Sequence, residues 1–138
     1  DGRKMSKSYN NTIALSDSPD VVQKKVMSMI TDPARIHKTD PGHPEVCAVY
    51  SYHKLFSEDD VPEIESMCRK GEIGCVACKK RLAQNVAKFM TPIWESRQEW
   101  LKRPDDIRDI IKEGNNKARE AASRTMADVR KAMNIDWI

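Results

Sequence analysis

The sequence predicts an all-α protein built as a helical bundle of about four to six helices. Apolar residues recur at intervals of three and four along several segments, which is the spacing of the buried face of an amphipathic helix. No alternation of apolar and polar residues persists long enough to indicate a strand. Clusters of proline, glycine and serine separate the periodic segments and mark the loops between helices.

Residues 1–17 are predicted to form a loop, because they hold a glycine, several serines and the adjacent Asn10 and Asn11 without a helical apolar stripe. A first helix then begins with Ser18, a favourable N-cap, and Pro19, which suits the first helical position. The residues on its apolar face are Val22, Val26, Met29 and Ile30.

Three further helices are predicted after a loop at 32–44, which holds three prolines and a glycine. One runs over residues 44–56, and one runs from about residue 60 to a turn that starts at Gly71. A long helix follows this turn, and Pro92 is expected to kink it. The apolar stripe of the long helix is Leu82, Val86, Phe89, Ile93 and Trp100.

A last helix is predicted after Arg103 and Pro104, and small residues along it should allow close packing against a neighbour. Its expected buried face is Ile107, Ile110, Ile111, Ala118, Ala122, Met126, Val129 and Met133. The chain is therefore divided into residues 1–17, a loop and linker, and residues 18–138, a helical domain.

Composition and charge fit an ordinary folded domain. The 138 residues suit one hydrophobic core, and 33% charged with 39% hydrophobic residues is not the balance of a disordered chain. The chain has no apolar run near the ~20 residues of a membrane span and no signal peptide at its start. We therefore expect a cytoplasmic protein that does not act in a membrane. The net charge of +3 is weak evidence for any partner.

A segment suited to binding phosphate lies at residues 4–8. It interleaves two lysines with a methionine and two serines: Lys4, Met5, Ser6, Lys7 and Ser8. Lysine brings a compact positive charge to phosphate oxygens, and serine hydroxyls add hydrogen bonds. Positioned lysines can stabilise the negative charge that builds up during nucleotidyl transfer. Solvated loops also carry such residues, so a binding loop and a plain surface loop both stay open at this point.

Four cysteines, Cys47, Cys68, Cys75 and Cys78, are separated by 20, 6 and 2 residues. Disulfides are not expected without a secretory signal. Cys75 and Cys78 form a pair that could bind one metal from a turn leading into a helix, whereas Cys47 and Cys68 are alternatively small buried hydrophobic residues. We expect one shared four-cysteine site, and four thiolates suit a structural zinc ion and an iron–sulfur cluster equally.

A basic group surrounds the cysteine turn: Arg69, Lys70, Lys79, Lys80 and Arg81. Such a run is often a solvated helix face. A metal held by the nearby thiolates would fix these side chains as one positive surface, and such a surface suits RNA phosphates. We expect the group to contact RNA.

Residues 4–8 reproduce, as a literal string, the signature loop of class I aminoacyl-tRNA synthetases. The wider segments 2–11, 31–33, 92–97 and 117–119 resemble tryptophanyl-tRNA synthetases, and the likeness covers nearly the whole chain. The resemblance implies a parent enzyme that activates tryptophan with ATP and Mg²⁺ to tryptophanyl-adenylate and then transfers tryptophan to tRNA(Trp). The family acts as a homodimer, and its C-terminal helical domain meets the tRNA anticodon.

The resemblance also implies roles for individual residues. Lys4 and Lys7 would be catalytic and contact the ATP phosphates, with Lys7 stabilising the pyrophosphate leaving group. Ser6 and Ser8 would assist them, and Met5 would hold the loop. Some similar enzymes carry a [4Fe–4S] cluster on four cysteines with a slightly longer first gap. We therefore expect a structural [4Fe–4S] cluster here, with Zn²⁺ as the alternative.

Parts of the family pattern are missing from the sequence. The second ATP motif, the parallel sheet and the tryptophan pocket are not found. We therefore expect a C-terminal portion of the enzyme that does not aminoacylate tRNA by itself. Two alternatives stay open. One is a non-enzymatic helical RNA-binding module with a structural metal, and the other is a different class I synthetase such as the tyrosyl enzyme.

Overall fold

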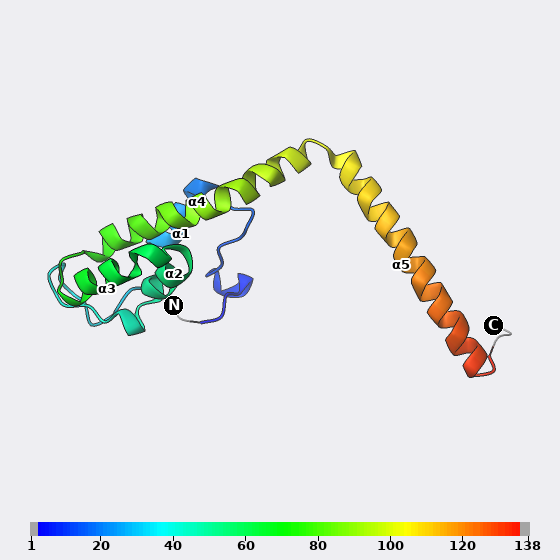
Figure 1. Cartoon of the computed structure of the whole chain (residues 1–138), viewed down its shortest axis with the longest axis horizontal. Coiled ribbons are helices and arrows are strands. Elements are labelled where there is room, and N and C mark those ends of the chain that lie inside the picture. The colour runs from blue at the N-terminus through cyan, green and yellow to red at the C-terminus, as the bar shows by residue number, and fades with distance from the viewer. Residues whose placement is uncertain (1–2, 136–138) are drawn as a thin grey trace. The chain divides into compact units, whose positions relative to one another are not determined.

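The computed structural model describes residues 3–135, and their α- and 3₁₀-helices are joined by loops (Figure 1). The α-helices are α1 (Pro19–Met27), α2 (Ala48–Phe56), α3 (Val61–Arg69), α4 (Cys75–Leu101) and α5 (Pro104–Ala132). The short 3₁₀-helices are η1 (Lys7–Tyr9), η2 (Pro44–Val46) and η3 (Glu58–Asp60). No strand is present among residues 3–135, which confirms the predicted all-α class. The chain forms two compact units, Asp1–Arg97 and Gln98–Ile138.

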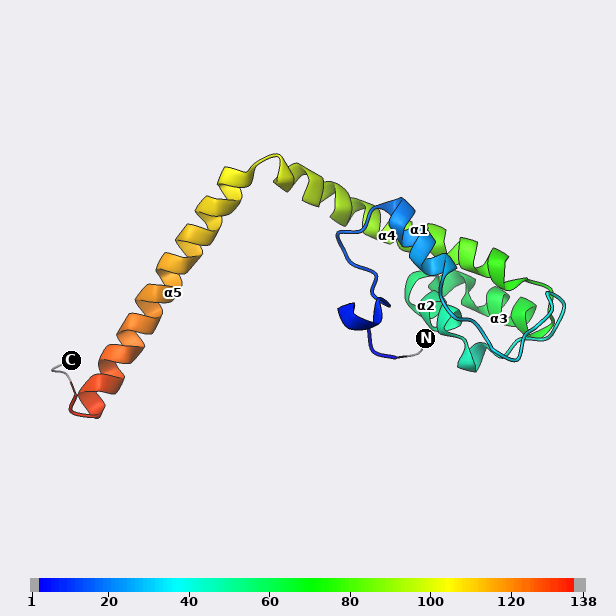
Figure 2. The same ribbon diagram turned by 180° about the vertical axis from the view of Figure 1, so that it is seen from behind.

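Helices α1 to α4 of the first unit share one hydrophobic core. Helix α1 contributes Val22 and Val26, both fully buried as its apolar spacing predicts. Figure 2 shows α1 lying beside α4, and the Lys79 Nζ on α4 donates to the Met27 carbonyl at the end of α1. The other core residues are Cys47, Val49, Tyr50, Ile64, Leu82, Ala83, Val86 and Met90.

The helix predicted over residues 44–56 is wrong at its start, because the structure divides it at Cys47. Residues Pro44–Val46 form η2, and Cys47 then takes an extended conformation with φ −93° and ψ 115° before α2 begins. An extended residue ahead of the first helical turn is the usual N-cap geometry. Cys47 therefore lies at a corner of the backbone and not within a continuous helix.

The apolar stripes of α4 and α5 were predicted to be buried along their whole length, and this is only partly correct. Leu82 and Val86 are buried, but Phe89 is 57% exposed and Trp100 is 39% exposed. In the second unit, no residue of α5 is buried, and a Cβ added at Gly114 would meet no neighbouring side chain or loop within 4 Å. A single helix cannot bury its own apolar stripe. The helical spacing of apolar residues therefore identifies the apolar face of α5 but does not show which element, if any, packs against it.

The end of α3 matches the predicted glycine stop in detail. Gly71 has φ +71°, and its N–H donates to the Cys68 carbonyl at 3.0 Å. The N–H of Glu72 donates to the Met67 carbonyl at 2.8 Å, which completes a Schellman motif. A Cβ on Gly71 would lie 2.2 Å from the Thr39 carbonyl oxygen, so the loop before η2 packs directly on this turn.

We expect Gly71→Ala to destabilise the first unit by about 1–3 kcal/mol, because alanine is strained at positive φ and would also collide with the Thr39 backbone. Gly114→Ala is the matched control, since it lies in the exposed interior of α5, where alanine should add ~0.8–1 kcal/mol of helix stability. Urea unfolding followed by circular dichroism measures both changes. Equal midpoints for Gly71→Ala and the unchanged protein would contradict the assigned strain.

Among the described residues, no helix is both long enough and apolar enough to cross a membrane.

Candidate functional site

The segment predicted to bind ATP phosphate folds as a short closed loop. Ser6 is extended and leads into η1, and Asn10 ends η1 in the left-handed conformation at φ 50°. The Asn11 side chain bridges the loop, because its Oδ1 accepts from the Ser6 N–H at 2.7 Å and its Nδ2 donates to the Lys4 carbonyl at 3.4 Å. Sequence reasoning missed this role of Asn11, although asparagine is a residue that commonly bonds to nearby backbone.

The polar side chains of this loop lie at its surface. Lys4, Lys7 and Ser8 are exposed, and the hydroxyls of Ser6 and Ser8 are 2.7 Å apart. Two ammonium groups in solvent, together with paired hydroxyls, leave donors free to meet an approaching anion. The loop can therefore present both positive charge and hydroxyl hydrogen bonds to phosphate oxygens.

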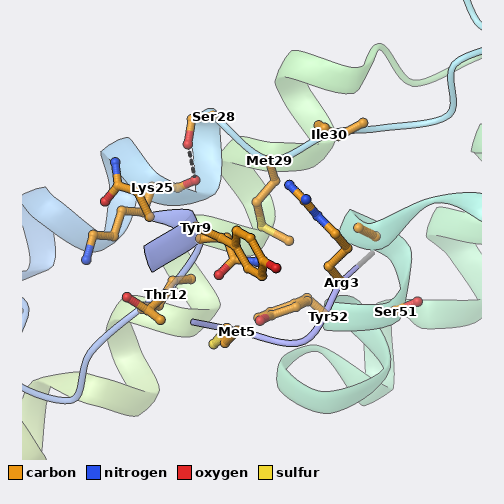
Figure 3. Close-up of a pocket in the computed structure, with 14 residues that line it drawn as sticks. Arg3, Met5, Tyr9, Thr12, Lys25, Ser28, Met29, Ile30, Ser51 and Tyr52 are labelled. Atoms are coloured by element: carbon orange, nitrogen blue, oxygen red, sulfur yellow. Dashed lines mark hydrogen bonds between the residues drawn. The ribbon is translucent and has the colours of Figure 1, made fainter. Parts of the chain in front are cut away.

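A cavity of about 470 Å³ separates the loop from α1 and α2 (Figure 3). The cavity is lined by Met5 and Tyr9 of the loop and by Met29 and Tyr52 of the helical core. The guanidinium of Arg3 lies over the Tyr9 ring at 4.6 Å. These side chains leave space between the loop and the core instead of packing it tightly.

The four cysteines come from three helix ends that meet in the first unit. Cys47 precedes α2, Cys68 lies near the end of α3, and Cys75 and Cys78 lie in the first turn of α4. All four are free thiols, and Cys47 is buried while the other three are partly exposed. The predicted juxtaposition of Cys68 with the Cys75 turn is visible in a shared partner, since the Arg35 guanidinium lies 3.9 Å from the Cys68 Sγ and 3.8 Å from the Cys75 Sγ.

Electrostatic interactions connect the four sulfurs to each other. Burial first, and then the charges of the Cys47, Cys68 and Cys75 thiolates, together raise the pKa of the Cys78 thiol to about 12. Burial also raises the pKa of Cys68, which Arg35 partly opposes. Within residues 3–135, no three Cys, His, Asp or Glu side chains are arranged to hold a single metal ion. The thiols therefore share one region without converging on one point.

Arg35 is a central residue of this region that sequence reasoning did not identify. Its NH2 group donates to the carbonyls of Lys38 and Ile73, both at 2.6 Å, which connects the loop before η2 to the turn before α4. Its Nε is buried and has no hydrogen-bond partner in the structure. An arginine in a loop rich in prolines has no sequence signal that separates it from a surface charge.

Gly42 allows the same loop to approach Cys68. Its N–H donates to the Cys68 carbonyl at 2.9 Å, and a Cβ at this position would lie 2.5 Å from the Cys68 Sγ. Any larger residue would therefore displace the sulfur or the loop. The glycine was predicted as a turn residue, and its close approach to a thiol depends on tertiary packing.

Asp32 holds the start and the end of this loop together. Its carboxylate accepts from the N–H of Ala34 at 2.9 Å and from both the N–H and the ring Nδ1 of His43 at 2.8 Å. Burial acts to raise the pKa of Asp32, but these hydrogen bonds outweigh it and the pKa is lowered. His43 is thus exposed and also a structural partner of a buried carboxylate.

The basic group predicted around the cysteine turn is not one uniform positive surface. Arg69 pairs with Glu65 and Glu45, and Arg81 pairs with Asp60 and Glu63. The Nζ of Lys79 donates to a carbonyl of α1. Lys70 and Lys80 are exposed. The spacing of the basic residues alone could not predict that neighbouring carboxylates neutralise the charges of Arg69 and Arg81.

Comparison with known proteins places the chain in a family. The family model described as tRNA synthetases class I (W and Y) matches residues 1–91. The tryptophan–tRNA ligase of Aquifex aeolicus is 52% identical over 98% of this chain, which covers 35% of that protein. That of Thermotoga maritima is 45% identical over 98% of the chain, which covers 42% of that protein.

Solved structures agree with the sequence comparison. The tryptophanyl-tRNA synthetase of Campylobacter jejuni superposes with a TM-score of 0.82 at 30% identity, over 96% of this chain and 43% of its own. A second structure of that enzyme, in complex with ADP and tryptophan, gives a TM-score of 0.83 at 31% identity over 97% of this chain and 42% of its own. The chain spans about a third to two fifths of the length of these relatives. The chain belongs to the class I tRNA synthetase family of the tryptophan and tyrosine group.

Proposed function

We propose that this chain supplies the ATP loop and the tRNA anticodon-binding helical region of a tryptophan–tRNA ligase. The observation that carries the proposal is the closed loop at residues 4–8, which presents Lys4 and Lys7 to solvent in a chain similar along its whole length to tryptophan–tRNA ligases. Residues 1–17 then act as loop and linker, and residues 18–138 act as the helical domain.

In the proposed reaction, the tryptophan carboxylate attacks the α-phosphorus of ATP, supplied with Mg²⁺, to form tryptophanyl-adenylate and release pyrophosphate. Tryptophan then passes to tRNA(Trp). Lys4 and Lys7 bind phosphate oxygens, and Lys7 stabilises the charge that develops on the leaving pyrophosphate. Ser6 and Ser8 donate hydrogen bonds, and Met5 holds the loop against the cavity wall. The cavity behind the loop gives it room to close over ATP.

Amino-acid-dependent exchange of pyrophosphate into ATP tests this function in a chain of the relatives' full length. We expect exchange with tryptophan and little with tyrosine. Exchange with tyrosine would favour the tyrosyl alternative. No exchange with either amino acid, combined with retained RNA binding, would favour a non-enzymatic RNA-binding module.

We also propose that Cys47, Cys68, Cys75 and Cys78 hold a [4Fe–4S] cluster with a structural role. Two observations support the fit. The Cys78 thiol interacts electrostatically with Cys47, Cys68 and Cys75, so the four sulfurs lie in one region of the first unit. Arg35 also places a positive charge between two of the sulfurs, next to a group that would carry net negative charge. When bound, the cluster would tie three helix ends together, and Zn²⁺ stays the alternative.

The proposed tRNA contacts are Arg69, Lys70, Lys79, Lys80 and Arg81, with unequal contributions. Arg69 and Arg81 already pair with carboxylates, so exchanging these ion pairs for phosphate contacts brings a smaller gain in tRNA affinity. Lys70 and Lys80 are exposed and can release condensed counterions from RNA phosphates.

We expect Lys80→Ala to weaken tRNA binding and to reduce the slope of log K against log salt by about 0.7–0.9, which is the value for one lost phosphate contact. Arg69→Ala is the matched comparison and should change the slope less, because the Arg69 charge is already paired with two carboxylates and so makes a weaker phosphate contact. Filter binding across a salt series measures both slopes. An unchanged slope for Lys80→Ala would indicate that Lys80 is a solvated surface lysine that makes no phosphate contact.

The resemblance further implies a cytoplasmic homodimer for the full-length enzyme, and we propose both. Light scattering of a chain of the relatives' length tests the dimer. Fractionation of cells tests the compartment.

A further inference from the structure

Asn11 lies just after the phosphate loop, and the proposed reaction gives it no role. Its side chain is half-buried and reaches back to two backbone groups of the loop. The Oδ1 accepts from the Ser6 N–H at 2.7 Å, and the Nδ2 donates to the Lys4 carbonyl at 3.4 Å. We call this pair of hydrogen bonds the Asn11 clamp. One carboxamide thus connects to the backbone on both sides of Met5.

The direction of both hydrogen bonds in the clamp is fixed by the backbone. A backbone N–H can only donate and a backbone carbonyl can only accept, so the carboxamide oxygen faces Ser6 and the NH₂ group faces Lys4. The reverse orientation would place two donors together at Ser6 and two acceptors together at Lys4. The contact with Ser6 is the stronger one, because 2.7 Å is within the usual range for N–H···O and 3.4 Å is long.

Ser6 connects the clamp to Lys7. Ser6 is extended, with φ −148° and ψ 142°, and Lys7 is the first residue of η1. The Tyr9 N–H donates to the Ser6 carbonyl at 3.2 Å, and the Asn10 N–H donates to the Lys7 carbonyl at 3.1 Å. A three-residue 3₁₀-helix gains little stability by itself, so its start depends on outside contacts. The hydrogen bond from Ser6 to Asn11 is such a contact.

The backbone of this loop controls where the two lysines can act. Lys4 and Lys7 are exposed, so the direction in which each side chain leaves the backbone decides which phosphate oxygens its ammonium group can reach. Groups that stabilise a transition state act best when they are held in place before the reaction, and a misplacement of about 1 Å can cost a factor of about 10². Restraint of the Ser6 backbone is therefore relevant to the rate.

We propose that Asn11 is a positioning residue for Lys7: its carboxamide fixes the Ser6 peptide, and η1 then directs the Lys7 side chain toward the ATP phosphates. The weaker contact with the Lys4 carbonyl orients the other lysine in the same way. The effect on catalysis rests on the proposed function of the loop, whereas the clamp itself does not.

The clamp can be measured in the 138-residue chain by NMR, from the exchange of the Ser6 amide with solvent. Asn11→Ala removes the acceptor, and we expect exchange to become about tenfold faster. Asn11→Asp keeps an oxygen at the Oδ1 position and should keep most of the protection. Asn116→Ala, on the exposed surface of α5, is the matched control for loss of one carboxamide and should change nothing. Equal exchange in Asn11→Ala and the unchanged protein would overturn the clamp.

The effect on catalysis is tested by a double-mutant cycle in a chain of the relatives' full length. Asn11→Ala should slow single-turnover adenylate formation about tenfold and leave the KM for tryptophan within twofold. If Asn11 acts by placing Lys7, its removal should matter less than threefold once Lys7→Ala is present. The same tenfold loss in both backgrounds would overturn the positioning role, because the effects of independent residues multiply.

Failure of the proposed function would give a different result in the same cycle. If Lys7→Ala alone leaves the rate within twofold, the catalytic role of Lys7 fails, and the positioning of Lys7 for catalysis fails with it. Exchange of the Ser6 amide then still decides whether the clamp exists. If Lys7→Ala slows adenylate formation and Asn11→Ala does not, the proposed function stands and the role of Asn11 is overturned.

Discussion

Lys7→Ala, in a chain of the relatives' full length, is expected to slow tryptophanyl-adenylate formation by about 10²–10³-fold, or roughly 2.7–4 kcal/mol of transition-state stabilisation, by analogy with loss of one oxyanion donor. The physical reason is that charge grows on the pyrophosphate oxygens as the α-phosphorus bond breaks. A lysine placed at these oxygens stabilises the transition state more than bound ATP. Single-turnover measurement of adenylate formation gives the rate directly.

The same variant should change tryptophan affinity little, because the proposed role of Lys7 is to bind the ATP phosphates and not the amino acid. Lys24→Ala, on the exposed face of α1, is the matched control for loss of one surface lysine and should leave the rate unchanged. A Lys7→Ala rate within twofold of the unchanged enzyme would remove Lys7 from the catalytic role. A comparable loss for Lys24→Ala would point to a general charge effect instead.

The helices of the first unit could be predicted from sequence because local signals and burial agree there. Ser18 and Pro19 start α1, Val22 and Val26 are buried on its face, and Gly71 ends α3 with the expected positive φ. Each of these signals depends on only a few neighbouring residues and agrees with the packing of the whole unit, so it can be recognised without knowing the tertiary contacts.

The stripe of α5 shows where periodicity stops being informative. Ile110 and Ile111 lie three and four residues after Ile107, which is helical spacing, yet they are 57% and 56% exposed. The helical spacing of apolar residues predicts a face that favours burial, but the element that would bury it is known only from the tertiary structure. The same limit applies to Phe89 on α4, which is 57% exposed although the next residue, Met90, is buried in the core.

Only the cysteines and the phosphate loop of the candidate site could be predicted from sequence, because their residues form short motifs of neighbouring positions. Arg35 lies 33 and 40 residues from the two cysteines it contacts, and His53 lies 25 residues from Cys78, so no local pattern connects them. The ion pairs of Arg69 and Arg81 depend likewise on where α3 and η3 meet α4. Tertiary packing brings these residues into contact, so the spacing of the charged residues in the sequence cannot predict the ion pairs.

Cys75→Ser is expected to reduce the iron bound after anaerobic purification from about four atoms per chain to a small fraction, because each cysteine holds one iron of the proposed cuboid. The variant should also lose the brown colour and unfold at lower denaturant, since metal–thiolate bonds contribute to folding free energy. Iron and sulfide analysis with urea unfolding measures both. The loop at residues 4–8 should be unaffected, because no thiol contacts it.

Ala77→Ser is the control for this experiment, because it adds a hydroxyl to an exposed position in the same first turn of α4 without touching a thiol. It should keep full iron content and stability. Zinc bound without colour in the unchanged protein would select the zinc alternative, and Cys75→Ser should then lower zinc content in the same way. Full cluster content in Cys75→Ser would exclude Cys75 as a ligand. No bound metal in the anaerobically purified protein would leave Arg35 and the thiols as a metal-free packing cluster, and both metal proposals would fail.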